Sequence, residues 1–275
     1  MAYATLDDFI SALCASTAQY NRATKISQTA EGGGFFHSLW LATGNYPSAA
    51  TTPLAFTADT TLLRPTNSVL GAIQFTNPAG GTEARLAFMA ASGATVGRVF
   101  LYDRVWHCSG FLGDTGSTQT ITNASSWPVN RGAADGLGVE AWLEFYGAIG
   151  TTARTITLSF RDTADSTVSA TYSHPTDTET VGQMVQMTLP SGCTGIRYPI
   201  SITLSGVSGA AGNFGVTLMR RIASIPIQLA SVGDSFDFAK LGFPKIESNA
   251  CLALMVLCSA TNTGVIMVDT TICEK

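Results

Sequence analysis

Charge is scarce in this sequence of 275 residues. Lys and Arg together number 15 and Asp and Glu 19, so only 12% of the chain is charged, against roughly 25% in an ordinary soluble domain. The net charge is -4, and no basic cluster is longer than Arg220-Arg221. Proteins that bind duplex nucleic acid or anionic membranes need clustered basic residues, so we expect no direct contact with either. The hydrophobic fraction of 45% excludes intrinsic disorder.

Long apolar runs and targeting signals are also missing. The longest apolar run, 250–258, is far shorter than the roughly 20 residues of a membrane-spanning helix. The N-terminus has no basic segment followed by an apolar one, so we expect no secretory signal. The cysteines form no CxxC pair, and without a secretory signal we expect their thiols to be reduced. They are Cys14, Cys108, Cys193, Cys251, Cys258 and Cys273.

Sequence motifs for catalysis or ligand binding are absent. There is no GxSxG, HExxH, GxxxxGK[ST] or complete GxGxxG. A metal site requires several ligands at suitable spacing, and the only histidines in the chain are His37, His107 and His174. Asp103 and His107 would lie roughly 13 Å apart on a strand, so we expect Asp103 and Arg104 to form local ion pairs instead. The sequence predicts a non-enzymatic protein with no catalytic residue, metal or cofactor.

The N-terminus carries the one clear helical pattern. Thr5 is a suitable N-cap, and Asp7 and Asp8 follow in the first turn, where they favour the positive end of the helix dipole. The apolar residues that follow lie on one stripe at helical spacing, and the pattern fades after Tyr20. The helix either packs on its own domain or docks on another subunit, so its apolar residues are candidate interface residues. The stripe consists of Leu6, Phe9, Ile10, Leu13 and Cys14, of which the first four are the candidates.

Most of the remaining chain predicts β-structure. Residues 21–84 are rich in turn formers and predict irregular, extended structure, and residues 85–97 fit either a helix or a strand. From Gly97 onward the apolar period is two, as in strands with one buried face. We expect an antiparallel hairpin from 138–146 and 155–161, and a second hairpin, buried on both faces, from 251–258 and 265–272. Further alternating runs lie at 99–104, 168–172, 185–189, 200–205 and 214–218.

These patterns predict an all-β fold, an antiparallel β-sandwich or jelly roll with one N-terminal α-helix. We expect a helix and irregular region over 1–84 and a β-sandwich domain over 85–275, with a soft internal boundary near 130–138.

One alternating strand draws attention because Glu140, Trp142, Glu144 and Tyr146 share a face. The two carboxylates would lie about 13 Å apart, beyond the roughly 5–9.5 Å that glycoside hydrolysis requires. We therefore expect a solvated or interfacial strand face, with Trp142 and Tyr146 as candidate interface residues that could also stack on a sugar ring. Arg220-Arg221 is interpreted as a charged strand end, with phosphate binding or pairing with acids of a neighbour as alternatives.

Several phrases of the chain resemble a group of virion structural proteins of tailed bacteriophages. They are Leu101–Gly110 (LYDRVWHCSG), Gly138–Phe160 (GVEAWLEFYGAIGTTARTITLSF), Gly195–Ile222 and Gly242–Gly264. The resemblance covers roughly residues 85–272 and is one of texture and local phrase, since none of these phrases is a catalytic motif. The group has no recognised active site, so no site residue is carried over from it.

The resemblance implies a capsid-associated decoration, cement or minor head protein, assembled in the host cytoplasm and located in the virion at the capsid surface. Its partners would be the major capsid protein and copies of itself, most simply in a homotrimer. A tail, collar or fibre component that contacts the host surface is the first alternative. A free carbohydrate-binding β-sandwich is the second.

Overall fold

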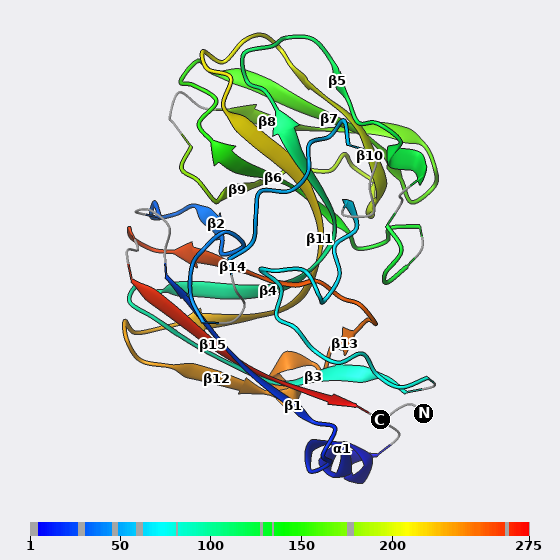
Figure 1. Ribbon diagram of the computed structural model, residues 1–275, viewed down its shortest axis with the longest axis vertical. Helices are drawn as coiled ribbons and strands as arrows, with labels where there is room; N and C mark the ends of the chain where they lie inside the picture. Colours follow the sequence, from blue (N-terminus) through cyan, green and yellow to red (C-terminus); the bar gives the residue numbers. More distant parts are fainter. Residues whose placement is uncertain are drawn as a thin grey trace.

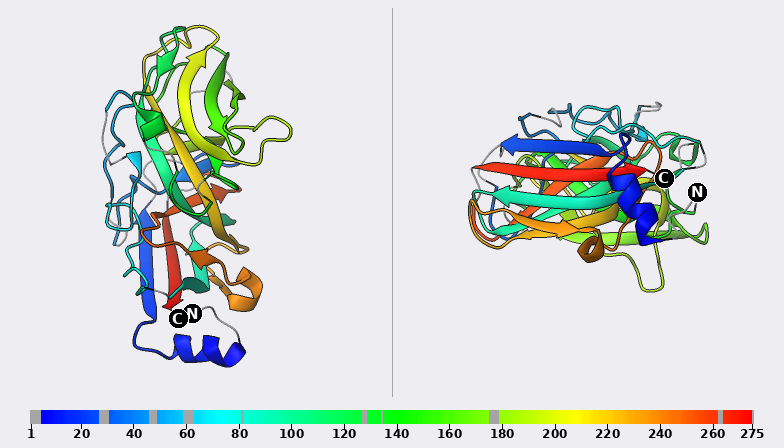
Figure 2. Two further views of the ribbon diagram at one scale, coloured as in Figure 1. Left: turned by 90° about the vertical axis from the view of Figure 1, so that its right-hand side faces the viewer. Right: turned by 90° about the horizontal axis from the view of Figure 1, so that it is seen from below.

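The computed structural model describes residues 5–26, 31–45, 49–58, 63–80, 82–126, 129–133, 135–174, 179–261 and 264–274. The molecule is elongated and has three tiers of β-structure (Figure 1). A closed barrel forms the middle, one sheet packs at its upper end, and a second sheet packs below it (Figures 1 and 2). The prediction of a mostly antiparallel all-β fold with a short N-terminal helix is confirmed.

The barrel closes in the order β11-β4-β14-β2-β9-β6. Its long members, β4 and β11, are paired along most of their length and extend into both outer tiers. Both faces of β4 are buried from Val99 to Ser109, so its polar residues Asp103, Arg104 and His107 lie in the interior together with its apolar ones. The bounds are Phe36–Ser38 for β2, Gly97–Phe111 for β4, Glu140–Gly147 for β6, Gln183–Gln186 for β9, Asn213–Ile227 for β11 and Leu252–Cys258 for β14.

The lower sheet has the strand order β1-β15-β3-β12, and β13 also pairs with β3. Its inner face packs against the lower outer face of the barrel, where Leu86 and Val268 meet Leu101 and Ile225 in one buried core. The bounds are Gln19–Ile26 for β1, Ala84–Gly93 for β3, Asp234–Asp237 for β12, Lys245–Ile246 for β13 and Val265–Glu274 for β15. The ambiguous segment 85–97 is therefore a strand followed by a turn, and it contains no helix.

The upper sheet has the strand order β5-β10-β7-β8. It packs on the upper half of the barrel, where Leu158 and Phe160 of β7 share a core with Leu143 and Phe145 of β6. Each end of the molecule is thus a sandwich that uses one part of the barrel as its second layer. The bounds are Gln119–Thr120 for β5, Arg154–Asp162 for β7, Thr167–His174 for β8 and Ile196–Leu204 for β10, with a short 3-10 turn at Ala124–Ser126.

Two expected hairpins are wrong in their pairing. Strands β6 and β7 follow each other in the chain, but β6 pairs with β9 and β11 while β7 pairs with β8 and β10. Likewise β14 belongs to the barrel and β15 to the lower sheet. Alternation fixes which face a residue occupies but not which strand lies beside it. Strand β14 is buried on both faces as expected, whereas Val265 and Met267 of β15 face outward.

The helix α1 spans Leu6–Leu13, shorter than the pattern to Tyr20 suggests. Thr5 is its N-cap, as the sequence predicts, and it also forms a capping box with Asp8. Residues 19–26 are strand β1, which pairs along its whole length with β15 at the other end of the sequence. Part of the region expected to be irregular is therefore built into the lower sheet. A second helix, α2, spans Phe238–Leu241.

Candidate functional site

The charged residues at the centre of the barrel pair across strands. Arg104 of β4 lies 2.7 Å from Glu144 of β6, and the two side chains are 1% and 0% exposed. Tyr146 and Thr217 also donate hydrogen bonds to Glu144, and Arg104 packs 4.5 Å from the ring of Trp40. Because each charge is hydrogen-bonded, the pair is tolerated in an apolar interior.

Burial and pairing act in opposite directions on these groups. Burial alone raises the pKa of Glu144, but the charge and hydrogen bonds of Arg104 outweigh it and leave the pKa below its usual value. Burial alone lowers the pKa of Arg104, and Glu144 more than compensates, so its pKa is raised. Burial also raises the pKa of Tyr146. The pair is thus ionised at neutral pH and acts as an internal cross-link between strands.

Asp103 points the other way from its neighbour Arg104. Its carboxylate accepts hydrogen bonds from Arg131 at 2.9–3.1 Å and from the main-chain N–H of Cys251 at 3.0 Å, and Arg220 lies 3.9 Å away. The expected local pair of Asp103 with Arg104 is therefore wrong, because adjacent residues of a strand face opposite sides.

The face of β6 that was expected to meet solvent faces the barrel interior. Trp142 is 1% exposed and packs with Phe36, Tyr102 and Met184, and Glu144 is fully buried against Arg104. A polar alternation looks the same whether the polar face meets water or an ion pair inside a barrel. The prediction that Trp142 and Tyr146 offer a face to a partner or a sugar is corrected: Trp142 is inaccessible, and Tyr146 donates its O–H to Glu144 at 2.7 Å.

Arg220 and Arg221 lie inside β11 rather than at a strand end. Arg220 lies within 4 Å of Asp103 and Glu247 of its own chain. Its charge is therefore compensated by carboxylates of the same molecule, and the interpretation of Arg220-Arg221 as a charged strand end is wrong in its position.

The histidines lie apart. Arg104 donates to Nδ1 of His107 at 3.1 Å, and since arginine cannot accept, this leaves the proton of neutral His107 on Nε2. Burial lowers the pKa of His37 to about 4, and His174 forms a buried pair with Glu179. Within the described ranges, no three His, Cys, Asp or Glu side chains come together to hold a metal ion. No described helix is long and apolar enough to cross a membrane.

A cavity of about 430 Å³ lies beside the barrel, next to Trp40 and His107. Trp40 donates its indole N–H to the carbonyl of Thr51, which holds the 50–54 wall in place. Leu54 and Leu70 stand at the cavity wall and are exposed. The cavity is largely apolar and lies in the size range of small-molecule sites.

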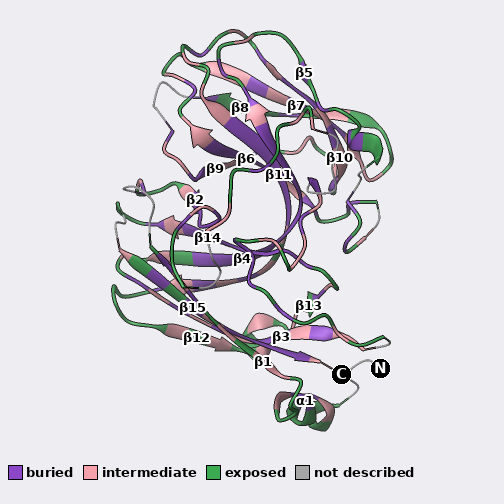
Figure 3. Ribbon diagram, in the orientation of Figure 1, coloured by how far each residue is buried: buried purple, intermediate pink, exposed green. Residues whose placement is uncertain are grey.

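Helix α1 presents one half of its apolar stripe to its own chain. Phe9 is buried among Ala87, Phe238 and Phe243, and Leu13 is partly buried in the same cluster. Leu6 and Ile10, two of the candidate interface residues, are 58% and 49% exposed. The helix thus packs on its own domain and leaves Leu6 and Ile10 available for a neighbour. Figure 3 shows exposed segments along α1.

The outer face of the lower sheet carries exposed apolar side chains that lie side by side. Ile26 of β1 is directly opposite Val265 of β15, and Thr24 is opposite Met267. Ile26, Val265 and Met267 are 45%, 41% and 47% exposed. We call the outward-facing side chains of β1 and β15 the outer face; they are Tyr20, Arg22, Thr24, Ile26, Val265, Met267 and Asp269.

Strand β1 forms one edge of the lower sheet and is covered over only part of its length. The main-chain N–H groups of Thr24 and Ile26 donate to the carbonyls of Asn45 and Thr43, and Lys25 donates to the carbonyl of Ala42 at 2.8 Å. Gly44 is pressed so closely on Thr24 that a Cβ there would lie 1.8 Å from the Thr24 carbonyl oxygen. Segment 42–45 therefore shields the second half of the edge.

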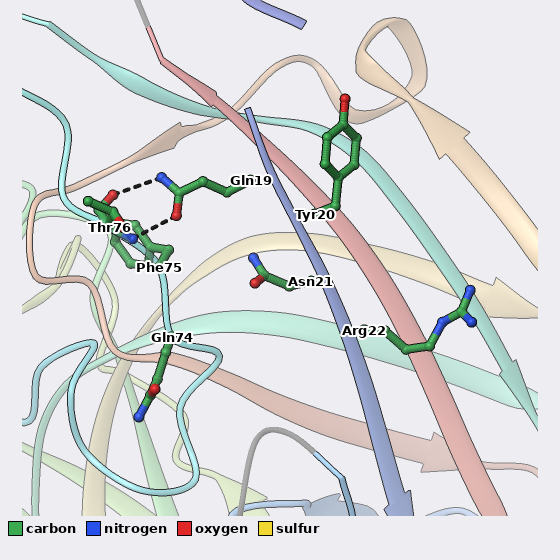
Figure 4. Close-up of a pocket in the computed structure, with 7 residues that line it drawn as sticks. All are labelled: Gln19, Tyr20, Asn21, Arg22, Gln74, Phe75 and Thr76. Carbon is green, nitrogen blue, oxygen red and sulfur yellow. Dashed lines mark hydrogen bonds between the residues drawn. The ribbon is translucent and has the colours of Figure 1, made fainter. Parts of the chain in front are cut away.

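The first half of the edge borders an open groove of about 610 Å³ (Figure 4). Residues 19–22 of β1 line one side of the groove and residues 74–76 the other. Gln19 spans the two sides at one end, where its side-chain amide donates to the carbonyl of Thr76 and accepts from the Thr76 N–H (Figure 4). Sequence reasoning missed this groove because residues 19–26 carry a polar pattern without the apolar alternation of a strand.

Comparison with known proteins identifies no relative by sequence and only weak structural similarity. No protein-family model and no curated protein sequence matches the chain. Among solved structures, it is similar to the VP2 subviral particle of infectious bursal disease virus, with 10% identity, a TM-score of 0.23, and coverage of 94% of this chain and 80% of that one. The Gt strain of the same virus gives 11% identity, a TM-score of 0.20, and coverage of 94% and 81%. Scores of this size do not establish a common fold.

Proposed function

We propose that this protein is a non-enzymatic structural subunit of a tailed-bacteriophage virion. It binds the outside of the capsid as a decoration or cement protein, with the major capsid protein and copies of itself as partners. The resemblance of several local phrases to phage virion proteins supports this assignment, as does the very low charge of the chain.

The outer face is the observation that carries the proposal. Ile26, Val265 and Met267 stand together in solvent on a regular sheet, and the charged residues beside them, Arg22 and Asp269, neutralise each other in a 2.7 Å ion pair. A sheet face that has to stay free in water usually carries unpaired charge, and a contiguous exposed apolar patch marks an interaction site. Leu6 and Ile10 of α1 add exposed apolar surface at the same, lower end of the molecule (Figure 2).

The mechanism is adhesion. A standard protein interface buries about 1,600 Å², and a shell protein present in many copies gains stability because each contact supports the next. We propose a homotrimer as the attached unit. Copy number in a purified particle separates this role from that of a tail or collar component, because a shell protein is present in many more copies than a component of one vertex.

Sedimentation equilibrium tests the role of the outer face. The wild-type protein is expected to self-associate, and Met267→Glu and Ile26→Glu are expected to shift it to monomer, since each places an unpaired charge in the contact. Val207→Glu is the matched control, because Val207 is 49% exposed but follows β10 at the opposite end of the molecule. A wild-type monomer at all attainable concentrations, or an equal effect of the control, would contradict the proposal.

A further inference from the structure

Among the described residues, none pairs with the main-chain groups of Tyr20 and Arg22 on the groove side. In an antiparallel ladder, alternate residues direct their N–H and C=O groups toward the same side. Thr24 and Ile26 direct theirs away from β15, toward Asn45 and Thr43, so Tyr20 and Arg22 do the same. No described residue bonds the N–H or C=O of these two residues there, although the rest of the edge is covered.

The groove beside them has the character of a missing strand position. Paired strands lie about 4.8 Å apart, but here the hydrogen bonds found between segment 74–76 and β1 in the described part of the chain are those of the Gln19 side chain. The Gln19 amide makes the same donor-plus-acceptor pair with the Thr76 main chain that a peptide group of an intervening strand would make (Figure 4). The lining is mainly polar, as hydrogen bonding through the main chain requires.

Asn21 supplies an independent sign of an unfilled site. It lines the groove, and its Nδ2 is buried without a hydrogen-bond partner. A buried donor left unpaired is unfavourable, so an acceptor that entered the groove would remove that cost. A carbonyl of an extended chain is such an acceptor.

We propose that this groove binds a single extended segment of another protein chain, which adds to β1 as a short strand with an acidic side chain beside Arg22. The walls on both sides exclude the edge of a second sheet, because such an edge brings its own neighbouring strand with it. Strand addition of this kind takes its affinity from main-chain hydrogen bonds and its selectivity from flanking side chains. Arg22 is 74% exposed at its side chain, and its ion pair with Asp269 uses Nε and Nη2, so Nη1 is the donor that an acidic side chain of the guest would meet.

A peptide titration tests the proposal on the intact protein and does not depend on the particle to which the protein belongs. The probe is the blocked peptide TVTDTVT, followed by NMR amide shifts and by hydrogen exchange. We expect shifts confined to residues 19–22 and 74–76 and slower exchange of the Tyr20 and Arg22 amides. The same peptide N-methylated at alternate residues is expected to have no effect, because it cannot pair with the edge.

Two substitutions at one position separate main-chain from side-chain recognition. Arg22→Pro removes the N–H that faces the groove while sparing the ladder with β15, since proline is accepted at outward-facing edge positions; it is expected to abolish peptide binding. Arg22→Ala keeps the N–H and is expected to bind the peptide but to lose the preference for TVTDTVT over TVTKTVT.

Three results would overturn the proposal. They are no shift with TVTDTVT in the wild-type protein, equal binding of the N-methylated peptide, and protection of the Tyr20 and Arg22 amides by raised protein concentration alone in the Met267→Glu variant, in which contact through the outer face is broken. The last result would replace the guest segment with self-association through this edge. The N-methylated control is made on the wild-type protein, so the test holds even where Arg22→Pro fails to fold.

Discussion

Arg104 of β4 and Glu144 of β6 form a 2.7 Å ion pair inside the barrel, where neither side chain is more than 1% exposed. The two strands are not neighbours, since β11 lies between them, so the pair ties together parts of the barrel that share no ladder. Trp40 covers one side of the guanidinium, and Thr217 of the intervening strand donates to the carboxylate. Although charged residues are rare in this chain, Arg104 and Glu144 lie where their ion pair links two strands of the barrel that are not adjacent.

Removing one partner of this ion pair is expected to destabilise the protein strongly. Arg104→Met leaves the Glu144 charge buried without compensation and should lower the free energy of unfolding by about 3–5 kcal/mol. The double variant Arg104→Met with Glu144→Leu should recover much of that loss, because no charge then remains unpaired. Urea denaturation provides the measurement, and Arg22→Ala, which breaks an exposed ion pair, is the control with little expected effect. A single variant no less stable than this control would show that the pair is not a cross-link.

Stability should fall on acidification in two separate windows. Burial holds the pKa of His37 at about 4 against an ordinary 6.5, so between these values the unfolded chain takes up a proton that the folded chain refuses, and stability falls as pH drops. Glu144 has a pKa below its ordinary 4.5, so its contribution is present above that pH and is lost below it. Denaturation midpoints across pH check this, with His37→Gln expected to flatten the upper window only. An unchanged slope in that variant would exclude His37 as the cause.

The thiols should differ sharply in reactivity. Burial raises the pKa of Cys108, raises that of Cys251 to about 12, and raises that of Cys258 to about 11. None of the six cysteines is disulfide-bonded, and Cys14 is the one that is exposed. A thiolate is the reactive form, so labelling of the native protein with a thiol reagent should modify Cys14 first and the buried thiols only on unfolding. Mass spectrometry of labelled peptides identifies the site, and fast labelling of Cys108 or Cys251 would contradict the packing described.

Two apolar residues of α1 should separate folding from association. Phe9 is buried against Phe238 and Phe243, so Phe9→Ala is expected to destabilise the protein by up to about 3 kcal/mol. Leu6 is 58% exposed, so Leu6→Glu should leave the melting temperature nearly unchanged and weaken self-association. Thermal unfolding and sedimentation of the same variants provide the test. The reverse pattern would show that α1 docks on another subunit through Phe9.

The sequence predicted which face of a strand each residue occupies, but it did not predict which strands lie side by side. Alternation correctly indicated the strands at Ile156 and Ile202, and Thr5 with Asp8 marked the start of α1. It did not indicate that β6 and β7 enter different sheets, because the choice of neighbour depends on packing between distant segments. Strand β1 escaped detection because a polar strand is stabilised here by pairing with the more apolar β15 and not by its own pattern.

The buried charged residues show a second limit of prediction from the sequence. Glu140 to Tyr146 alternates in the same way that a solvent-facing strand does, and the reversal became visible only with Arg104 across the barrel. One signal was present: Asp103 and Arg104 stand between the apolar residues Val99–Tyr102 and Val105–Trp106, and a charge in a strand buried on both faces requires a partner. The groove at Gln19–Arg22 had no comparable signal, since unpaired main-chain groups leave no trace in side-chain composition.

The most direct measurement of the central claim is the temperature at which phage particles release their genome, compared between particles with and without this protein. The account predicts release at a lower temperature when the protein is missing, and the same lowering in particles carrying Met267→Glu, with Val207→Glu behaving as the wild type. Release at one common temperature in all of these particles would contradict a cement role for the protein.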